Sequence, residues 1–158
     1  MQTVTVPMES LAEVIRLQLD NGGRANLTVT GNSMYPMLLG RRDSVTLIPP
    51  ANLKKGDVIL FQRESGAYIL HRIIGITAQG YICSGDNQAI REPVSPERVV
   101  AVVDSFVRKG KCHTVKTGFY RFYSAVWVGM FGLRPVYLVC WRYLGRLRRK
   151  LRSVFRNK

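Results

Sequence analysis

Ser33 has the sequence surroundings of a nucleophile. It follows residues 27–30, a short apolar and β-branched run typical of a strand, and it stands between Gly31 and Pro36. Glycine permits a tight turn and proline restricts how the chain leaves it, so the hydroxyl would be presented where a strand ends. A serine hydroxyl attacks efficiently only when a nearby base accepts its proton. The chain must therefore supply a base elsewhere.

The chain has two histidines, and His71 is the better base. His113 lies in the basic stretch 111–114, where a solvated surface residue is the simpler interpretation. His71 lies in the almost wholly apolar stretch 68–74. A lone histidine there is most often a core residue, but a shielded, neutral imidazole can accept a proton near pH 7. Because Ser33 is available, we predict that His71 is the general base.

A carboxylate that orients the imidazole would complete a catalytic triad. Asp86 lies in Gly-Asp-Asn at 85–87, just after the segment predicted to pair with the His71 strand, and Glu92 follows six residues later. An aspartate in such a turn can also simply hydrogen-bond its own loop. Both carboxylates remain candidates at this point.

The segments between predicted turns indicate a mainly β fold. The expected strands are 27–30, 44–48, 57–62, 67–76, 80–84 and 98–107. No helical pattern separates them, which favours an antiparallel or barrel-like sheet. Ser10 and Glu13 have capping-box spacing, which predicts a short N-terminal helix over 9–21.

The charge distribution divides the chain into two parts. Residues 1–105 hold ten Lys/Arg and all ten Asp/Glu, whereas residues 106–158 hold fourteen Lys/Arg and no acid, which accounts for the net charge of +14. We therefore predict a catalytic β domain over 1–107 and a basic, aromatic-rich, helical tail over 108–158 that associates with a membrane or a partner.

The tail has two membrane-like features. The charge-free run 122–133 ends at Arg134-Pro135, and about 20 apolar residues are needed to cross a bilayer, so a span would have to use the whole of 122–141. Leu144, Leu147, Leu151 and Val154 then form a helical stripe among arginines, as in a cationic amphipathic helix at an anionic lipid surface. Interfacial attachment is favoured, with a spanning segment or packing on the domain or a partner as alternatives. Nucleic acid is disfavoured because the interleaved aromatic residues suit lipid better.

The cysteines indicate the compartment. Cys83, Cys112 and Cys140 are widely spaced and odd in number, which suits neither a disulfide framework nor a zinc site. No secretory signal opens the chain. We expect reduced thiols, no cofactor or metal ion, and a peripheral position on the cytoplasmic face of a membrane.

Four short motifs in order resemble the type I signal peptidases and their LexA-like relatives, the S24/S26-like serine peptidases. They are Gly-Asn-Ser-Met-Tyr-Pro at 31–36, Lys-Gly-Asp-Val-Ile-Leu-Phe at 55–61, His-Arg-Ile-Ile-Gly at 71–75 and Gly-Asp-Asn at 85–87. Asp43 also lies where that family has an acidic residue. The resemblance covers about residues 27–105 and implies the family's β-rich catalytic fold.

The histidine at the base position resembles the endoplasmic-reticulum, archaeal and sporulation branch. This resemblance implies that Ser33 attacks the scissile carbonyl and that His71 transfers its proton. The backbone at Ser33, with its neighbours Asn32 and Met34, would form the oxyanion site. It also implies an acidic third member, for which Asp86 is favoured and Glu92 is the alternative or supporting residue.

The function implied by this resemblance is a serine endopeptidase that cleaves an extended peptide or preprotein near a membrane. A catalytically silent binding module of the same fold, anchored at a membrane or bound to a precursor peptide, is the alternative. A membrane or transporter protein is a further partner to consider.

Overall fold

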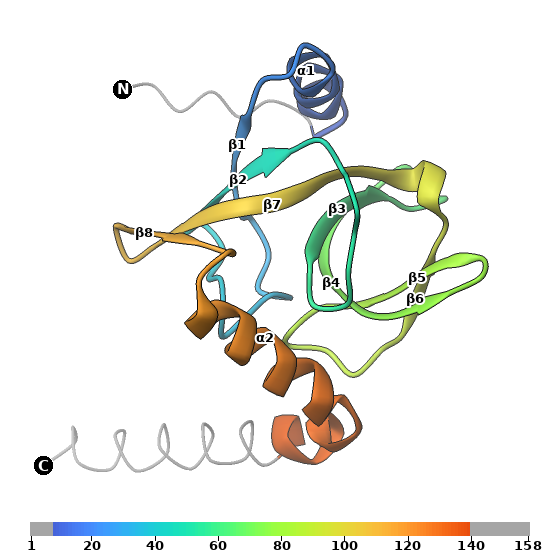
Figure 1. The fold of residues 1–158 in the computed structure, drawn as a ribbon, viewed down its shortest axis with the longest axis vertical. Helices are drawn as coiled ribbons and strands as arrows, with labels where there is room; N and C mark the ends of the chain where they lie inside the picture. The colour runs from blue at the N-terminus through green and yellow to red at the C-terminus, as the bar shows by residue number, and fades with distance from the viewer. Residues whose placement is uncertain (1–7, 140–158) are drawn as a thin grey trace, which may run out of the picture.

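The computed structural model describes residues 8–139, and Figure 1 shows their arrangement. Eight antiparallel strands form one sheet in the order β1-β2-β7-β3-β4-β5-β6, with β8 paired to β7. The elements are α1 (Met8–Asp20), β1 (Ala25–Thr28), β2 (Ser44–Ile48), β3 (Val58–Gln62), β4 (Tyr68–Thr77), β5 (Gly80–Ser84), β6 (Glu92–Val94), η1 (Pro96–Arg98), β7 (Val99–Arg108), β8 (Lys111–Thr114), α2 (Gly118–Gly129) and η2 (Met130–Leu133). The predicted mainly β fold with a helix near each end is confirmed.

Two strands were not predicted, and one ends early. β6 has three residues and contains Pro93, while β8 is exposed along most of its length, so neither shows a clear alternating pattern. β1 ends at Thr28 because the chain then pairs with the segment before β2. The Val29 amide donates to the Asp43 carbonyl (3.0 Å), and the Arg41 amide donates to the Val29 carbonyl (2.6 Å).

β3 lies between two apolar clusters and carries side chains into both. Val58 and Leu60 belong to the larger cluster, which also contains α1 residues Ile15 and Leu19. Ile59 and Phe61 belong to the smaller cluster. Successive side chains of a strand point to opposite faces, so both faces of β3 are covered. β4 pairs with this well-anchored strand, and His71 lies opposite Ile59.

α2 lies on the lower side of the molecule in Figure 1, away from α1. Thr117 caps its start by accepting from the Tyr120 amide (3.3 Å). Its buried residues recur every fourth position, at Tyr120, Ser124 and Val128, so one face of α2 packs on the sheet domain. The predicted tail thus begins with β8 and continues in a packed helix.

The helical stretch Gly118–Val139 is long and apolar enough to cross a membrane, by length and composition alone. Cys83 is a buried free thiol and Cys112 an exposed one. Cys140 and the predicted amphipathic stripe at 144–154 lie outside the described residues.

Candidate active site

Ser33 opens the turn that follows β1. The turn covers residues 33–37 and is closed by the Leu38 amide, which donates to the Met34 carbonyl (2.9 Å). Met34 and Leu38 are buried beneath it, whereas Ser33 is half-buried. The Asn32 side chain accepts from the Gly40 amide (3.1 Å), which ties the turn to the return of the chain. The apolar residues of the turn therefore anchor it and leave Ser33 near the surface.

The loop after β5 meets the Ser33 turn directly. The Asn87 amide donates to the Ser33 carbonyl (2.7 Å), and the Asn87 side chain donates to the Asn32 carbonyl (3.3 Å). A Cβ atom on Gly85 would lie 2.7 Å from the Ser33 carbonyl oxygen and 3.0 Å from His71 Nε2. The first distance is too short for any Cβ atom and the second would press on the imidazole ring, so glycine at 85 allows the close approach. The serine turn and the histidine ring thus converge on Gly85.

His71 is almost completely buried, with an exposed fraction of 2%. Its Nδ1 atom lies 3.4 Å from Glu92 Oε2, an ion-pair distance, and makes no hydrogen bond of normal geometry within the described part of the chain. Burial lowers the pKa of His71 below its usual 6.5 because it disfavours the cation, although the Glu92 charge acts in the opposite direction. The imidazole is therefore neutral near pH 7.

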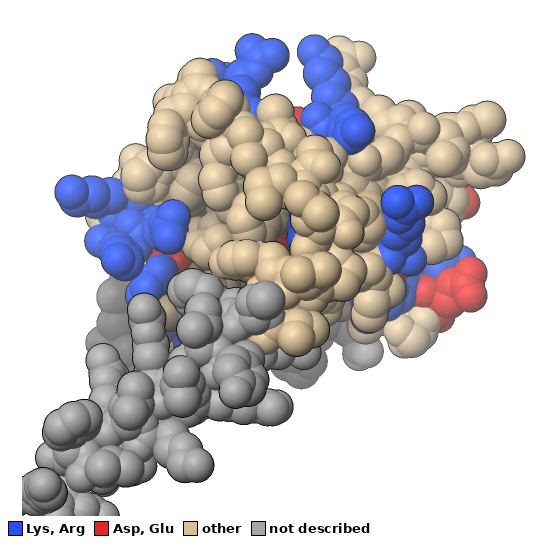
Figure 2. Space-filling model, turned by 90° about the horizontal axis from the view of Figure 1, so that it is seen from below, with Lys and Arg blue, Asp and Glu red and all other residues tan. Residues whose placement is uncertain are grey.

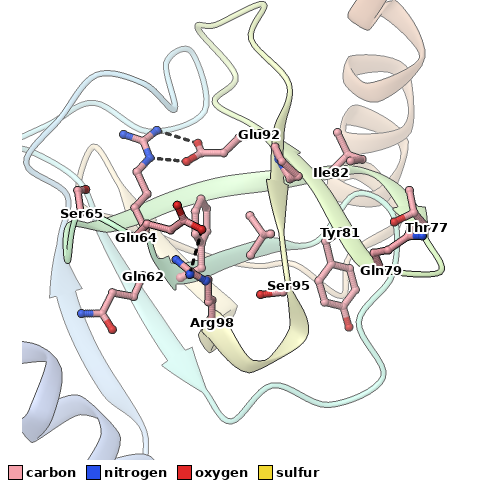
Figure 3. A pocket seen from close by; sticks show the side chains of 14 residues that line it. Gln62, Glu64, Ser65, Thr77, Gln79, Tyr81, Ile82, Glu92, Ser95 and Arg98 are labelled. Atoms are coloured by element: carbon pink, nitrogen blue, oxygen red, sulfur yellow. Dashed lines mark hydrogen bonds and ion pairs between the residues drawn. The ribbon is translucent and has the colours of Figure 1, made fainter.

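Glu92, at the start of β6, is held in place by Arg63. The Arg63 guanidinium donates to both carboxylate oxygens of Glu92. Its Nη2 atom lies 2.7 Å from Oε2, and its Nε atom contacts Oε1. The hydrogen bond from Arg63 is the main reason that the pKa of Glu92 is lowered, so the carboxylate stays ionised beside His71. Figure 3 shows Glu92 at the wall of a pocket of about 560 Å³, with both bonds from the guanidinium dashed.

Asp86 has a different partner. Arg72 donates from Nε to Asp86 Oδ1 (2.8 Å) and from Nη2 to Oδ2 (2.7 Å), and both side chains are fully buried. Arg72 and His71 are neighbours on β4, so their side chains point to opposite faces of the sheet. The sequence favoured Asp86 as the carboxylate of the base, whereas the carboxylate that the structure places against Nδ1 is that of Glu92.

Arg72 also connects this region to α2. Its Nη1 group donates to Tyr120 Oη (3.1 Å), Ser124 Oγ (2.9 Å) and the Gly56 carbonyl (2.8 Å). The contacts of Arg72 and the contact between Arg63 and Glu92 could not be predicted from the sequence, because the partners lie 16 to 52 positions apart.

Asp43, which lies where the resembled family has an acidic residue, binds main-chain amides near the Ser33 turn. Its carboxylate is buried, pairs with Arg42, and accepts from the amides of Leu39 (2.8 Å) and Lys109 (3.3 Å). The Arg42 guanidinium lowers the pKa of Asp43 to about 2. Asp43 therefore ties the end of the Ser33 turn to the end of β7.

A narrow cleft of about 130 Å³ runs beside Ser33. It is lined by Leu27, Thr28, Val29, Thr30, Gly31, Ser33, Met34, Leu60, Tyr68, Ile69 and Leu70. Its walls thus come from the extended chain before Ser33 and from the start of β4, the strand that carries His71. Its mostly apolar lining suits small, uncharged side chains.

One comparison with known proteins finds a match over part of the chain. A 60-residue segment is 42% identical to signal peptidase I W of Bacillus subtilis (strain 168), and it covers 34% of this chain and 32% of that protein. The chain therefore matches about a third of the length of this relative. No protein-family profile and no solved structure matches the chain. The local similarity suggests the signal peptidase family and supports a peptidase function at that level.

Proposed function

We propose that the chain is a serine endopeptidase in which Ser33 is the nucleophile, His71 the general base and Glu92 the carboxylate that supports it. One observation carries the proposal. The Ser33 backbone and His71 Nε2 both approach Gly85, while His71 Nδ1 faces an ionised Glu92. A neutral imidazole with one nitrogen directed toward the serine region and the other toward a carboxylate is the arrangement that proton transfer requires.

The reaction has two balanced steps. Ser33 Oγ attacks the scissile carbonyl carbon and gives its proton to His71 Nε2, and that proton then moves to the leaving amine as the C–N bond breaks. Water next attacks the acyl-ester, His71 accepts a proton from it, and Ser33 Oγ regains a proton as it leaves. Glu92 stabilises the transient imidazolium. Amide N–H groups of the Ser33 turn, at Ser33 and Met34, would stabilise the oxyanion, with Asn32 shaping the turn.

The substrate would bind as an extended strand in the cleft beside Ser33. β1 lies at the edge of the described sheet, and residues 28–31 at its end line the cleft together with residues 68–70 of β4. Extended backbone of this kind can pair with a peptide, while the cleft selects side chains at alternate positions.

A peptide library tests this activity. Purified full-length protein, with and without lipid vesicles, should cleave a defined set of peptides, which appear as new N-termini by mass spectrometry. Peptide binding without any hydrolysis would contradict the peptidase and support the alternative, a binding module of the same fold. The weak geometry of the His71–Glu92 contact is the observation that favours this second candidate.

The outer face of α2 supports a location at a membrane. Its large apolar side chains are exposed, Phe119 by 83% and Phe122 by 69%, together with Val126. Exposed apolar side chains continue beyond the helix at Met130, Leu133 and Val136. Seen from below, the surface is largely uncharged at its centre, with Lys and Arg side chains around it (Figure 2). Because the inner face of α2 is bound to Arg72, docking along the surface is favoured over crossing the bilayer.

A pocket beside α2 also combines apolar surface with positive charge. Its volume is about 330 Å³, and its lining combines the aromatic rings of Phe106, Phe119, Tyr120 and Tyr123 with the basic residues Arg108, Lys109 and Lys111. Apolar surface bordered by cations suits the interface of an anionic lipid layer. We therefore propose that α2 and the basic tail hold the protein on an anionic membrane.

Vesicle binding tests the docking face. The protein should bind phosphatidylglycerol vesicles more tightly than phosphatidylcholine vesicles, and the double substitution Phe119→Ser with Phe122→Ser should weaken binding about tenfold or more. Val14→Ser with Leu17→Ser, on the exposed face of α1, removes comparably exposed apolar side chains from the opposite side and should change nothing. Equal loss in both double variants, or equal binding to the two lipids, would contradict this docking face.

A further inference from the structure

We infer that Arg134 is a positioning residue of the active site, because it holds the Gly85–Gln88 loop against Ser33 and His71. This inference rests on the proposed peptidase function and adds to it a residue from the C-terminal helical segment. Arg134 follows η2 directly and has an exposed fraction of only 2%. By sequence it lies 49 positions from the loop that it contacts.

The guanidinium of Arg134 is used to bind main-chain carbonyl groups. Nη1 donates to the carbonyls of Gly85 (3.0 Å) and Gln88 (3.3 Å), and Nη2 donates to the carbonyl of Trp127 (3.0 Å). The cation also lies over the rings of Trp127, at 5.4 Å, and Phe131, at 5.0 Å. Burying a cation costs free energy unless it is bound and hydrogen-bonded. Here the compensating acceptors are two carbonyls of one loop and one carbonyl of α2.

The same two loop carbonyls are also held from the sheet side. The Oγ of Ser84, the last residue of β5, lies within hydrogen-bond distance of both carbonyls, 3.2 Å from that of Gly85 and 3.3 Å from that of Gln88, and its single proton can be shared between them. The Gln88 amide closes the loop on the Gly85 carbonyl (3.0 Å). The loop is therefore clamped between β5 and Arg134, and the rigid fork of an arginine suits such a bridge better than a lysine does.

The clamped loop contacts the reacting residues directly. Asn87 donates to the Ser33 carbonyl, and Gly85 lies against His71 Nε2. If the loop moved outward, the Ser33 turn would lose a 2.7 Å hydrogen bond and the space around Nε2 would open. Small displacements of this kind reduce reaction rates far more than they reduce binding. Arg134 thus acts on the chemistry through the loop, without touching the substrate cleft.

Arg91 offers a matched control. Its guanidinium also lies over the Phe131 ring, at 5.3 Å, but Arg91 is exposed, and none of the hydrogen bonds in the described residues joins its side chain to the 85–88 loop. Arg134→Gln and Arg91→Gln remove the same charge and the same kind of ring contact. They differ in the burial of the side chain, in the contact with Trp127 and in the hydrogen bonds to the loop.

The experiment combines two measurements on the full-length wild type, Arg134→Gln, Arg134→Lys and Arg91→Gln. Hydrogen exchange of the Asn87 and Gln88 amides reports on the loop, whereas the rate and affinity constants for labelling of Ser33 by a fluorophosphonate report on the site. In Arg134→Gln we expect roughly tenfold faster exchange and a maximal labelling rate about 10- to 100-fold lower, with unchanged probe affinity. Arg134→Lys should be intermediate, and Arg91→Gln should match the wild type.

The outcomes separate this inference from the proposed function. Unchanged exchange of both amides in Arg134→Gln, or an unchanged labelling rate despite faster exchange, would overturn the positioning role. An equal loss of labelling in Arg91→Gln would also overturn it, since charge or ring contacts would then be responsible. Absence of labelling in the wild-type protein would instead overturn the peptidase itself, and the amide exchange would still report whether Arg134 clamps the loop.

Discussion

Replacing His71 with Asn or Ser33 with Ala should lower kcat/KM for a cleaved peptide by roughly 10³-fold or more, because either change removes one half of the proton-transfer pair. Asn is close to histidine in size and polarity, which limits damage to the buried site between Phe61 and Glu92. Ser33 is half-buried, so Ala should leave the fold intact. Peptide cleavage followed by mass spectrometry measures the effect.

His113→Asn is the control for this prediction. His113 is exposed on β8 and stacks on Phe106, with the ring centroids 5.2 Å apart. It is far in sequence from the Ser33 turn, His71 and the loop at Gly85. Its replacement should leave cleavage unchanged. If Ser33→Ala retained full activity, or if His113→Asn were as inactive as His71→Asn, the assignment of the pair would be refuted.

Glu92→Gln should mainly lower the activity, whereas Asp86→Asn should mainly lower the stability. Both changes replace a carboxylate by the amide of equal size. Glu92→Gln removes the charge facing His71 Nδ1, so we expect kcat/KM to fall about 10²- to 10⁴-fold with little loss of stability. Asp86→Asn leaves the buried Arg72 without its charge partner, which should cost about 3–5 kcal/mol of the free energy of unfolding.

Urea denaturation and peptide cleavage together separate the two carboxylates. Asp86→Asn should unfold at a much lower urea concentration, and the protein that remains folded should keep Glu92 and His71 in contact. A stable Asp86→Asn variant that has lost cleavage, beside an active Glu92→Gln variant, would identify Asp86 as the third catalytic residue. That result would restore the assignment favoured by the sequence.

The sequence predicts the parts of this site that depend on short motifs. Ser33 is marked by its strand-and-turn context, and His71 by its apolar stretch. The mainly β fold follows from closely spaced strands. These features are local, and each can be recognised within a few residues.

The features that the sequence does not predict depend on long-range geometry. The sequence favours Asp86 and keeps Glu92 as the alternative, and only the pairing of β5 with β6 brings Glu92 to His71. Arg63 follows β3, which lies three places from β6 in the order of the strands. For the charge-free run 122–133 the sequence favoured interfacial attachment and left a spanning segment or packing on the domain open. Ser124 and the adjoining Arg134 point inward because their partners are buried polar groups of the domain. Tertiary contacts thus decided what local patterns left open.

The pH dependence of Ser33 labelling tests the central claim most directly. A fluorophosphonate adduct would be assigned by mass spectrometry to the peptide that contains Ser33, and its rate followed from about pH 4 to about pH 9. Only the neutral imidazole can accept a proton, and burial lowers the pKa of His71 below 6.5. The labelling rate should therefore stay constant at neutral pH and fall only below pH 6.5. The His71→Asn variant should be labelled slowly, and its rate should not show this decrease at acidic pH. Equal labelling in His71→Asn at every pH would contradict a Ser33–His71 pair.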